Sequence, residues 1–159
     1  MYAQNVVKVA LCVSVLLLSC AVQAQKLSDL LVTKEAKPGL WAFKYLQIPK
    51  GLEAYLKPGS ACATAEQLFE SLSRSTQMVR IGKNGEKSCP TTIVSDKVSE
   101  ANLKTICTKE HIGIDFEVTN TIKRITPDTW ISTVSSPNSA GGMQIIETSI
   151  KYMGECQTK

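Results

Sequence analysis

Residues 38–156 carry the alternation of apolar and polar positions that is typical of β-strands. Residues 112–119 are the clearest case, because apolar side chains occupy the even positions and small or polar ones the odd positions. Successive side chains on a strand point to opposite faces, so this segment predicts a strand with one buried face. Further strands are predicted at residues 40–48, 77–83, 91–98, 102–108, 129–135 and 143–155.

Turn signals separate these strands. Pro38-Gly39 precedes the first strand, Asn84-Gly85 is a tight-turn dipeptide, and Thr126-Pro127-Asp128 reverses the chain. Two longer loops, residues 49–60 and 135–142, are rich in Pro and Gly. Short connections of this kind favour an antiparallel meander, in which strands adjacent in sequence also pair in the sheet.

One helix is predicted at residues 65–73. Thr64-Ala65-Glu66-Gln67 matches a capping box, in which Thr64 bonds forward to an orphan amide and Gln67 reaches back. Leu68, Phe69 and Leu72 then supply an apolar stripe at helical spacing.

Two disulfides are predicted from the cysteines outside the N-terminal segment, which could pair in three ways. Folding residues 91–98 and 102–108 into a hairpin about Val98-Ser99 places Cys89 opposite Cys107. The same register sets Ile93 opposite Leu103, Thr92 opposite Lys104 and Val94 opposite Asn102, so one face of the pair is apolar. Cys62 is then left to pair with Cys156.

These elements predict an all-β-dominated fold: an antiparallel meander of six to seven strands, curled or barrel-like, with one α-helix and two disulfides. The aromatic side chains Trp41, Phe43 and Tyr45 share one face of the first strand, and Trp130 lies on a later strand. We expect these four to pack the core, with a ligand-stacking surface as the alternative.

The first 24 residues predict export. Lys8, an apolar run at residues 9–18 and the small-residue exit Val22-Gln23-Ala24 form a secretory signal. The run is about ten residues, short of the roughly 20 that span a bilayer as a helix. The alternative is a lipobox, Leu17-Leu18-Ser19-Cys20, in which Cys20 would be lipidated and hold the domain on a membrane.

Four segments are therefore predicted: a signal peptide (1–24), an N-terminal lead-in (25–37), one β-rich domain (38–156) and a tail (157–159). The net charge of +4 falls to +3 without Lys8. This charge is mild and its basic residues are scattered, which argues against a nucleic-acid partner. We expect a periplasmic monomer, or an outer-membrane lipoprotein if Cys20 is lipidated.

No catalytic or metal site is predicted. His111 is the single histidine, and Asp115 and Glu117 occupy the solvent face of their strand. The cysteines show no CxxC spacing, and no nucleophile-elbow or Gly-rich phosphate motif is present. We therefore expect no cofactor and no enzymatic activity.

The order of several short motifs resembles one family, the small exported bacterial proteins known as domain of unknown function thirty-six seventeen. The motifs run from Pro38-Gly39-Leu40-Trp41, through Cys62 before the capped helix, Ser88-Cys89-Pro90, Cys107 and Asp128-Thr129-Trp130, to the ending Lys151-Tyr152-Met153-Gly154-Glu155-Cys156. The resemblance implies a periplasmic or membrane-tethered domain and lends no catalytic residue. A Lys-rich segment, residues 44–57, departs from the family pattern.

The expected function is therefore binding. Either the domain interacts with an envelope protein, for instance by offering a strand edge, or it carries a lipid or other apolar ligand as a lipocalin does.

Overall fold

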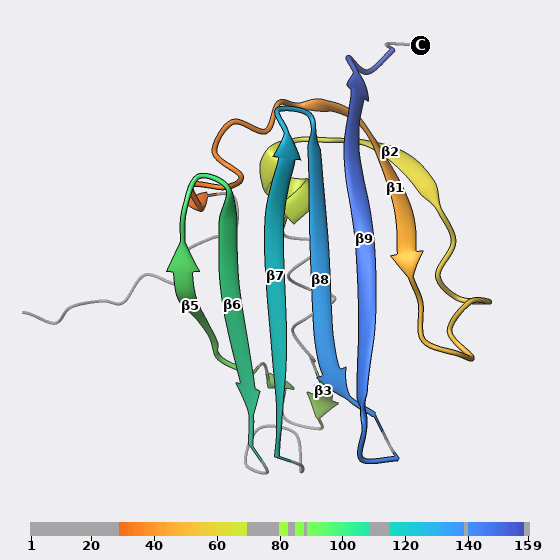
Figure 1. Ribbon diagram of the computed structural model, residues 1–159, viewed down its shortest axis with the longest axis vertical. Helices are drawn as coiled ribbons and strands as arrows, with labels where there is room; N and C mark the ends of the chain where they lie inside the picture. Colours follow the sequence, from red (N-terminus) through yellow and green to blue (C-terminus); the bar gives the residue numbers. More distant parts are fainter. Residues whose placement is uncertain are drawn as a thin grey trace, which may run out of the picture.

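A single open sheet of seven antiparallel strands dominates the structure (Figure 1). The computed structural model describes residues 29–69, 80–82, 85–87, 89–108, 115–138 and 140–157. The sheet comprises β1 (Gly39–Gln47), β2 (Gly59–Ala63), β5 (Thr91–Asp96), β6 (Glu100–Cys107), β7 (Phe116–Thr126), β8 (Thr129–Pro137) and β9 (Met143–Gly154). β3 (Arg80–Gly82) and β4 (Gly85–Lys87) form a separate pair. The predicted fold class is confirmed, with the sheet open rather than closed into a barrel.

The strand order is β2-β1-β9-β8-β7-β6-β5. Strands β5 to β9 lie side by side in chain order, as expected for the predicted meander. The β1–β2 hairpin comes first in the chain but adds beside β9, the last strand (Figure 1). The two ends of the domain are therefore brought together in the sheet.

Most strand positions match the sequence pattern, but β2 does not. Residues 59–60 fall within the predicted loop, and Gly59–Ala63 contains only small side chains, which have weak strand propensity. The strand forms because its backbone pairs with β1, from Gly39 opposite Ala63 to Phe43 opposite Gly59. Such pairing depends on a partner far along the chain and leaves no local hydrophobic signal.

The β5–β6 hairpin has the predicted register in the half farther from the turn, at residues 91–93 of β5. Ile93 lies opposite Leu103 and Thr92 opposite Lys104. The predicted pairing of Val94 with Asn102 is wrong, because a bulge after Ile93 brings Ser95 opposite Asn102. A hairpin closed by a two-residue turn at Val98-Ser99 would set each β5 residue one position away from the partner that the Cys89–Cys107 bond requires. The bulge at Val94 provides the one extra residue that makes both pairings possible.

The predicted helix start is confirmed at Thr64. The backbone N–H of Gln67 donates to Thr64 Oγ1 at 3.2 Å, and the N–H of Thr64 donates to Gln67 Oε1 at 3.0 Å. Residues 65–69 are helical in the described chain, and the predicted continuation to residue 73 lies outside the described residues. Leu68 and Phe69 are buried and press this turn onto the sheet.

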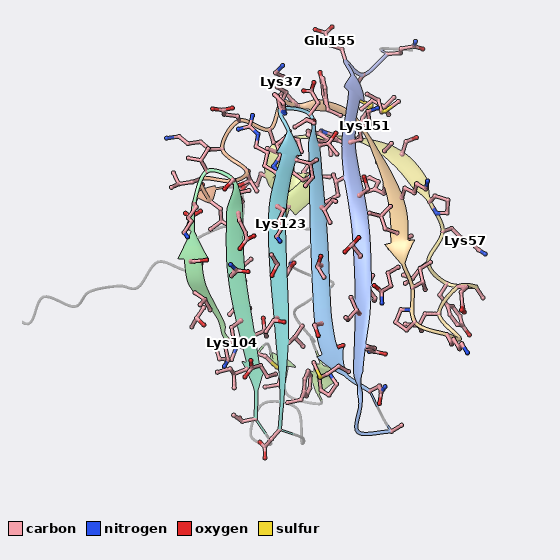
Figure 2. All side chains as sticks on the ribbon, in the orientation of Figure 1. Lys37, Lys57, Lys104, Lys123, Lys151 and Glu155 are labelled. Atoms are coloured by element: carbon pink, nitrogen blue, oxygen red, sulfur yellow. A yellow bond between two sulfur atoms is a disulfide. The ribbon has the colours of Figure 1, made fainter. Side chains whose placement is uncertain are left out.

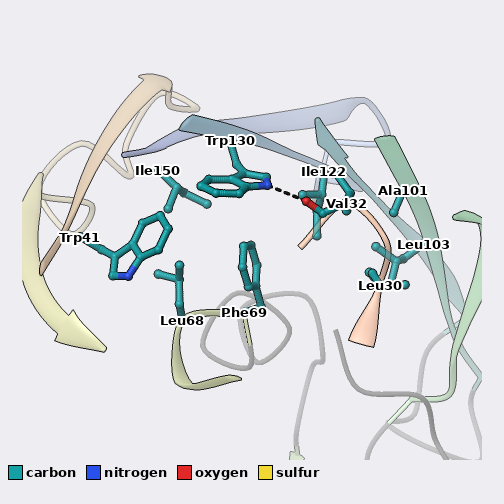
Figure 3. Close-up of a cluster of buried hydrophobic side chains, with 10 residues drawn as sticks. All are labelled: Leu30, Val32, Trp41, Leu68, Phe69, Ala101, Leu103, Ile122, Trp130 and Ile150. Carbon is teal, nitrogen blue, oxygen red and sulfur yellow. Dashed lines mark hydrogen bonds between the residues drawn. The ribbon is translucent and has the colours of Figure 1, made fainter. Parts of the chain in front are cut away.

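The main core lies on one face of the sheet, which we call the core face (Figure 3). Sheet strands contribute Trp41, Ala101, Leu103, Ile122, Trp130 and Ile150, and the helix contributes Leu68 and Phe69. The N-terminal segment adds Leu30 and Val32, both completely buried. These two residues of the predicted lead-in are thus packed into the core of the sheet.

Candidate functional site

An aromatic cluster occupies the centre of the core face. The ring centroids of Trp41 and Trp130 are 5.4 Å apart, Tyr152 lies 5.2 Å from Trp41, and Phe69 lies 6.2 Å from Trp130. Tilted and edge-on contacts of this kind are favourable between aromatic rings. Both tryptophans are almost completely buried, so the rings contact one another rather than offering an open stacking surface.

The four aromatic residues singled out from the sequence differ in burial. Trp41 and Trp130 are in the core, and Phe43 is partly buried against it. Tyr45 is farther along β1 and only half-buried. The structure adds two aromatic partners to these residues: Phe69, which the sequence placed on the apolar stripe of the helix, and Tyr152 from β9, which the sequence pattern did not single out.

The indole N–H groups of both tryptophans are satisfied by the lead-in. Trp130 Nε1 donates to the Val32 carbonyl at 2.8 Å, as Figure 3 shows, and Trp41 Nε1 donates to the Lys37 carbonyl at 3.2 Å. The Arg124 guanidinium also bonds Glu35 at 2.6 Å. Buried indole N–H groups need hydrogen-bond acceptors, and residues 32–37 supply them. The same contacts hold this segment against the sheet.

A row of buried polar side chains crosses the core face beside this cluster. Thr105, Asn120, Ser132 and Thr148 come from four successive strands, β6 to β9. Ser132 Oγ donates to Asn120 Oδ1 at 3.1 Å, whereas Asn120 Nδ2 has no hydrogen-bond partner among the described residues. On β6, Thr105 of this row lies between Leu103 of the main core and Cys107, which forms a smaller buried cluster with Cys89.

Both predicted disulfides are present. Cys89 and Cys107 are buried, with their Cα atoms 4.9 Å apart. Cys62 and Cys156, with Cα atoms 5.8 Å apart, connect β2 to the residues after β9. Disulfides persist in oxidising surroundings, so the two bonds indicate an extracytoplasmic compartment.

The outer face of the sheet carries polar and charged side chains. Lys104 pairs with Glu117 at 2.6 Å, which confirms the predicted solvent position of Glu117, and Lys123 pairs with Glu100 at 3.3 Å. A hydrogen bond from Asn102, followed by one from Lys123, lowers the pKa of the Glu100 carboxyl. Exposed pairs of this kind contribute little stability and suggest no reaction chemistry.

The two edges of the sheet are built differently. At β5 the bulge after Ile93 distorts the edge, and the Asp96 carboxylate accepts a hydrogen bond from the Leu31 N–H at 2.9 Å. Bulges and charged side chains protect an edge from pairing with other chains. β2, at the opposite edge, has no bulge in its pairing with β1 and contains neither a charge nor a proline.

Several predicted positions lie outside the described residues, among them His111, Cys20 and the signal peptide. Within the described ranges, no group of three or more His, Cys, Asp or Glu side chains could hold a metal ion. No helix in the same ranges is long and apolar enough to cross a membrane.

No family model matches the chain, and neither the curated proteins nor the solved structures contain a significant match. The resemblance to domain of unknown function thirty-six seventeen therefore stays a prediction.

Proposed function

We propose that this chain is an exported, non-catalytic interaction module that binds an extended segment of an envelope protein at the edge of β2. The observation that carries the proposal is the contrast between the two edges of the sheet. β5 has a bulge and its Asp96 side chain is hydrogen-bonded to Leu31, whereas β2 has no bulge, carries no charge and is exposed at four of its five residues. A strand with these properties can pair with a further strand.

The geometry of β2 favours strand addition in two ways. Its small side chains let another backbone approach from the open side, where no described segment pairs with it. The Cys62–Cys156 bond also anchors the strand to the residues after β9. β2 therefore loses less conformational entropy when a partner binds.

The alternative, a lipocalin-like carrier of an apolar ligand, has less support. Such a carrier needs an apolar cavity, whereas the buried aromatic cluster fills the centre of the core face with the protein's own side chains. Extraction of the purified protein with organic solvent, followed by mass spectrometry, is expected to yield no stoichiometric lipid. A lipid present at one per chain would favour the carrier instead.

Strand addition predicts a selective effect of charge on β2. Ser60→Lys is expected to abolish the complex with an envelope protein, because a lysine on an edge strand opposes further pairing. The matched Thr92→Lys, at an exposed position of β5, should leave the complex intact. The measurement is recovery of the complex from envelope extracts, followed by hydrogen exchange of the β2 amides with and without the bound protein.

Protection confined to residues 59–63, and its loss in Ser60→Lys alone, would support the proposal. Protection elsewhere on the sheet, or equal loss in both lysine variants, would refute it. The thermal unfolding of each variant serves as the folding control, since both substitutions lie at exposed positions.

We further propose that the module is released into the periplasm after cleavage behind Ala24, with outer-membrane attachment through Cys20 as the alternative. If Cys20 is lipidated, Cys20→Ala is expected to convert a detergent-extracted protein into a freely released one. If release is correct, fractionation is unchanged and the first residue of the purified protein is Gln25. N-terminal sequencing with membrane fractionation separates these outcomes.

A further inference from the structure

The loop between β1 and β2, residues 48–58, holds Tyr55 out in solvent. The Tyr55 side chain is 80 % exposed, the largest exposed fraction among the large hydrophobic side chains that are exposed in the described residues. Figure 1 shows the loop extending past the end of β1, at the edge that β2 forms. An aromatic side chain this exposed contributes no hydrophobic stabilisation to the fold. Exposed apolar groups of this kind can mark a site of interaction.

The loop is ordered by its own hydrogen bonds. The N–H groups of Tyr55 and Leu56 both donate to the Leu52 carbonyl at 3.0 Å, and the Leu52 N–H donates to the Pro49 carbonyl at 3.1 Å. The Glu53 carboxylate accepts from the Gly51 N–H at 2.6 Å. The turn is therefore preorganised with Tyr55 pointing away from the core.

Three exposed lysines lie in or next to this loop. Lys50 and Lys57 flank Tyr55 along the loop, and Lys44 is exposed on β1. Figure 2 shows Lys57 on the loop, well apart from the paired Lys104 and Lys123 on the outer face. Glu53 is the single acidic residue between Gly39 and Ala63, so with three lysines this stretch keeps a net positive charge.

We propose that the β1–β2 loop contacts the surface of an anionic lipid bilayer. Lys44, Lys50 and Lys57 are attracted to lipid phosphates, and the Tyr55 ring enters the headgroup region, where amphipathic aromatic rings are favoured. A projecting loop suits a flat surface, whereas a small anion is generally held in a concave site. The contact goes beyond strand binding at β2 and needs no acyl chain.

The test uses the exported protein carrying Cys20→Ala, so that no acyl chain contributes. The vesicles are either pure phosphatidylcholine or a mixture of phosphatidylcholine with anionic phosphatidylglycerol. Binding by cosedimentation is expected with the anionic vesicles alone and is expected to weaken as salt is raised. Lys50→Gln with Lys57→Gln should reduce binding by about 25-fold, since each lysine near an anionic surface contributes roughly five-fold.

The matched control removes the same charge elsewhere. Lys97→Gln with Lys151→Gln, both exposed and outside the loop, should change binding by less than about two-fold. Tyr55→Ser should weaken binding to anionic vesicles, while Val98→Ser, at another exposed apolar position, should not. Equal binding to both vesicle types, an equal loss in the control pair, or binding to polyglutamate but not to vesicles would overturn the proposal.

Discussion

Removal of the Cys62–Cys156 bond, by Cys62→Ser with Cys156→Ser, is expected to lower the free energy of unfolding by about 4–5 kcal/mol. The bond closes a loop with a sequence separation of 94 residues, so it strongly restricts the unfolded chain. In the native sheet it also joins edge strand β2 to the residues after β9 across the intervening β1. Urea unfolding under non-reducing conditions measures the change.

The second disulfide provides the matched comparison. Cys89→Ser with Cys107→Ser opens a much shorter loop, with a separation of 18 residues, and should cost about 3 kcal/mol in the same chain-entropy description. If the Cys62–Cys156 variant lost less than about 1 kcal/mol, chain entropy would not be the source of the stabilisation. β2 would then be held chiefly by its pairing with β1.

Trp41→Ala is expected to destabilise the protein by about 3–5 kcal/mol, because a large buried ring is replaced by a cavity. Trp41 is fully buried and contacts both Trp130 and Tyr152, so neighbouring side chains on two other strands, β8 and β9, lose packing. The native protein should also show blue-shifted tryptophan fluorescence, since both indoles are buried. Urea unfolding followed by this fluorescence measures both properties.

Tyr55→Ala is the control for Trp41→Ala, because Tyr55 is an aromatic residue that is 80 % exposed; the expected change is within about 0.5 kcal/mol. Trp130→Phe separates packing from hydrogen bonding, since it keeps a ring but removes the donor to the Val32 carbonyl. Near-native stability of Trp41→Ala, together with loss of ligand capture, would contradict the core assignment and favour the carrier.

Much of the fold could be predicted because its signals are local. Alternation located β8 and β9 to within two residues, and the Thr64–Gln67 capping box located the helix start. The strand predicted at residues 112–119 overlaps β7 only in part, because β7 continues to Thr126. The Cys89–Cys107 pairing followed from hairpin symmetry. The predicted register was wrong only near Val94, where the bulge lies. Alternation of apolar and polar residues does not show that the turn and the disulfide require registers that differ by one residue.

The candidate sites were harder to predict, because their residues lack a local pattern. The β2 edge consists of small residues that carry no strand signal, and its exposure depends on β1 inserting between β2 and β9. The buried row that contains Asn120 and Ser132 also has no sequence signature. Each of its residues occupies an ordinary inward position on a different strand.

The sequence by itself determined the strand-rich class, the disulfide pairing and the burial of Trp41 and Trp130, because alternation, turn chemistry and hairpin symmetry act over short distances. Tertiary structure alone decided three features: the placement of β1 beside β9, the packing of Leu30 and Val32 into the core, and the exposure of β2 as an edge. These features depend on contacts between residues far apart in the chain. Such contacts are selected by the total burial and hydrogen bonding of the folded sheet, which no single segment encodes.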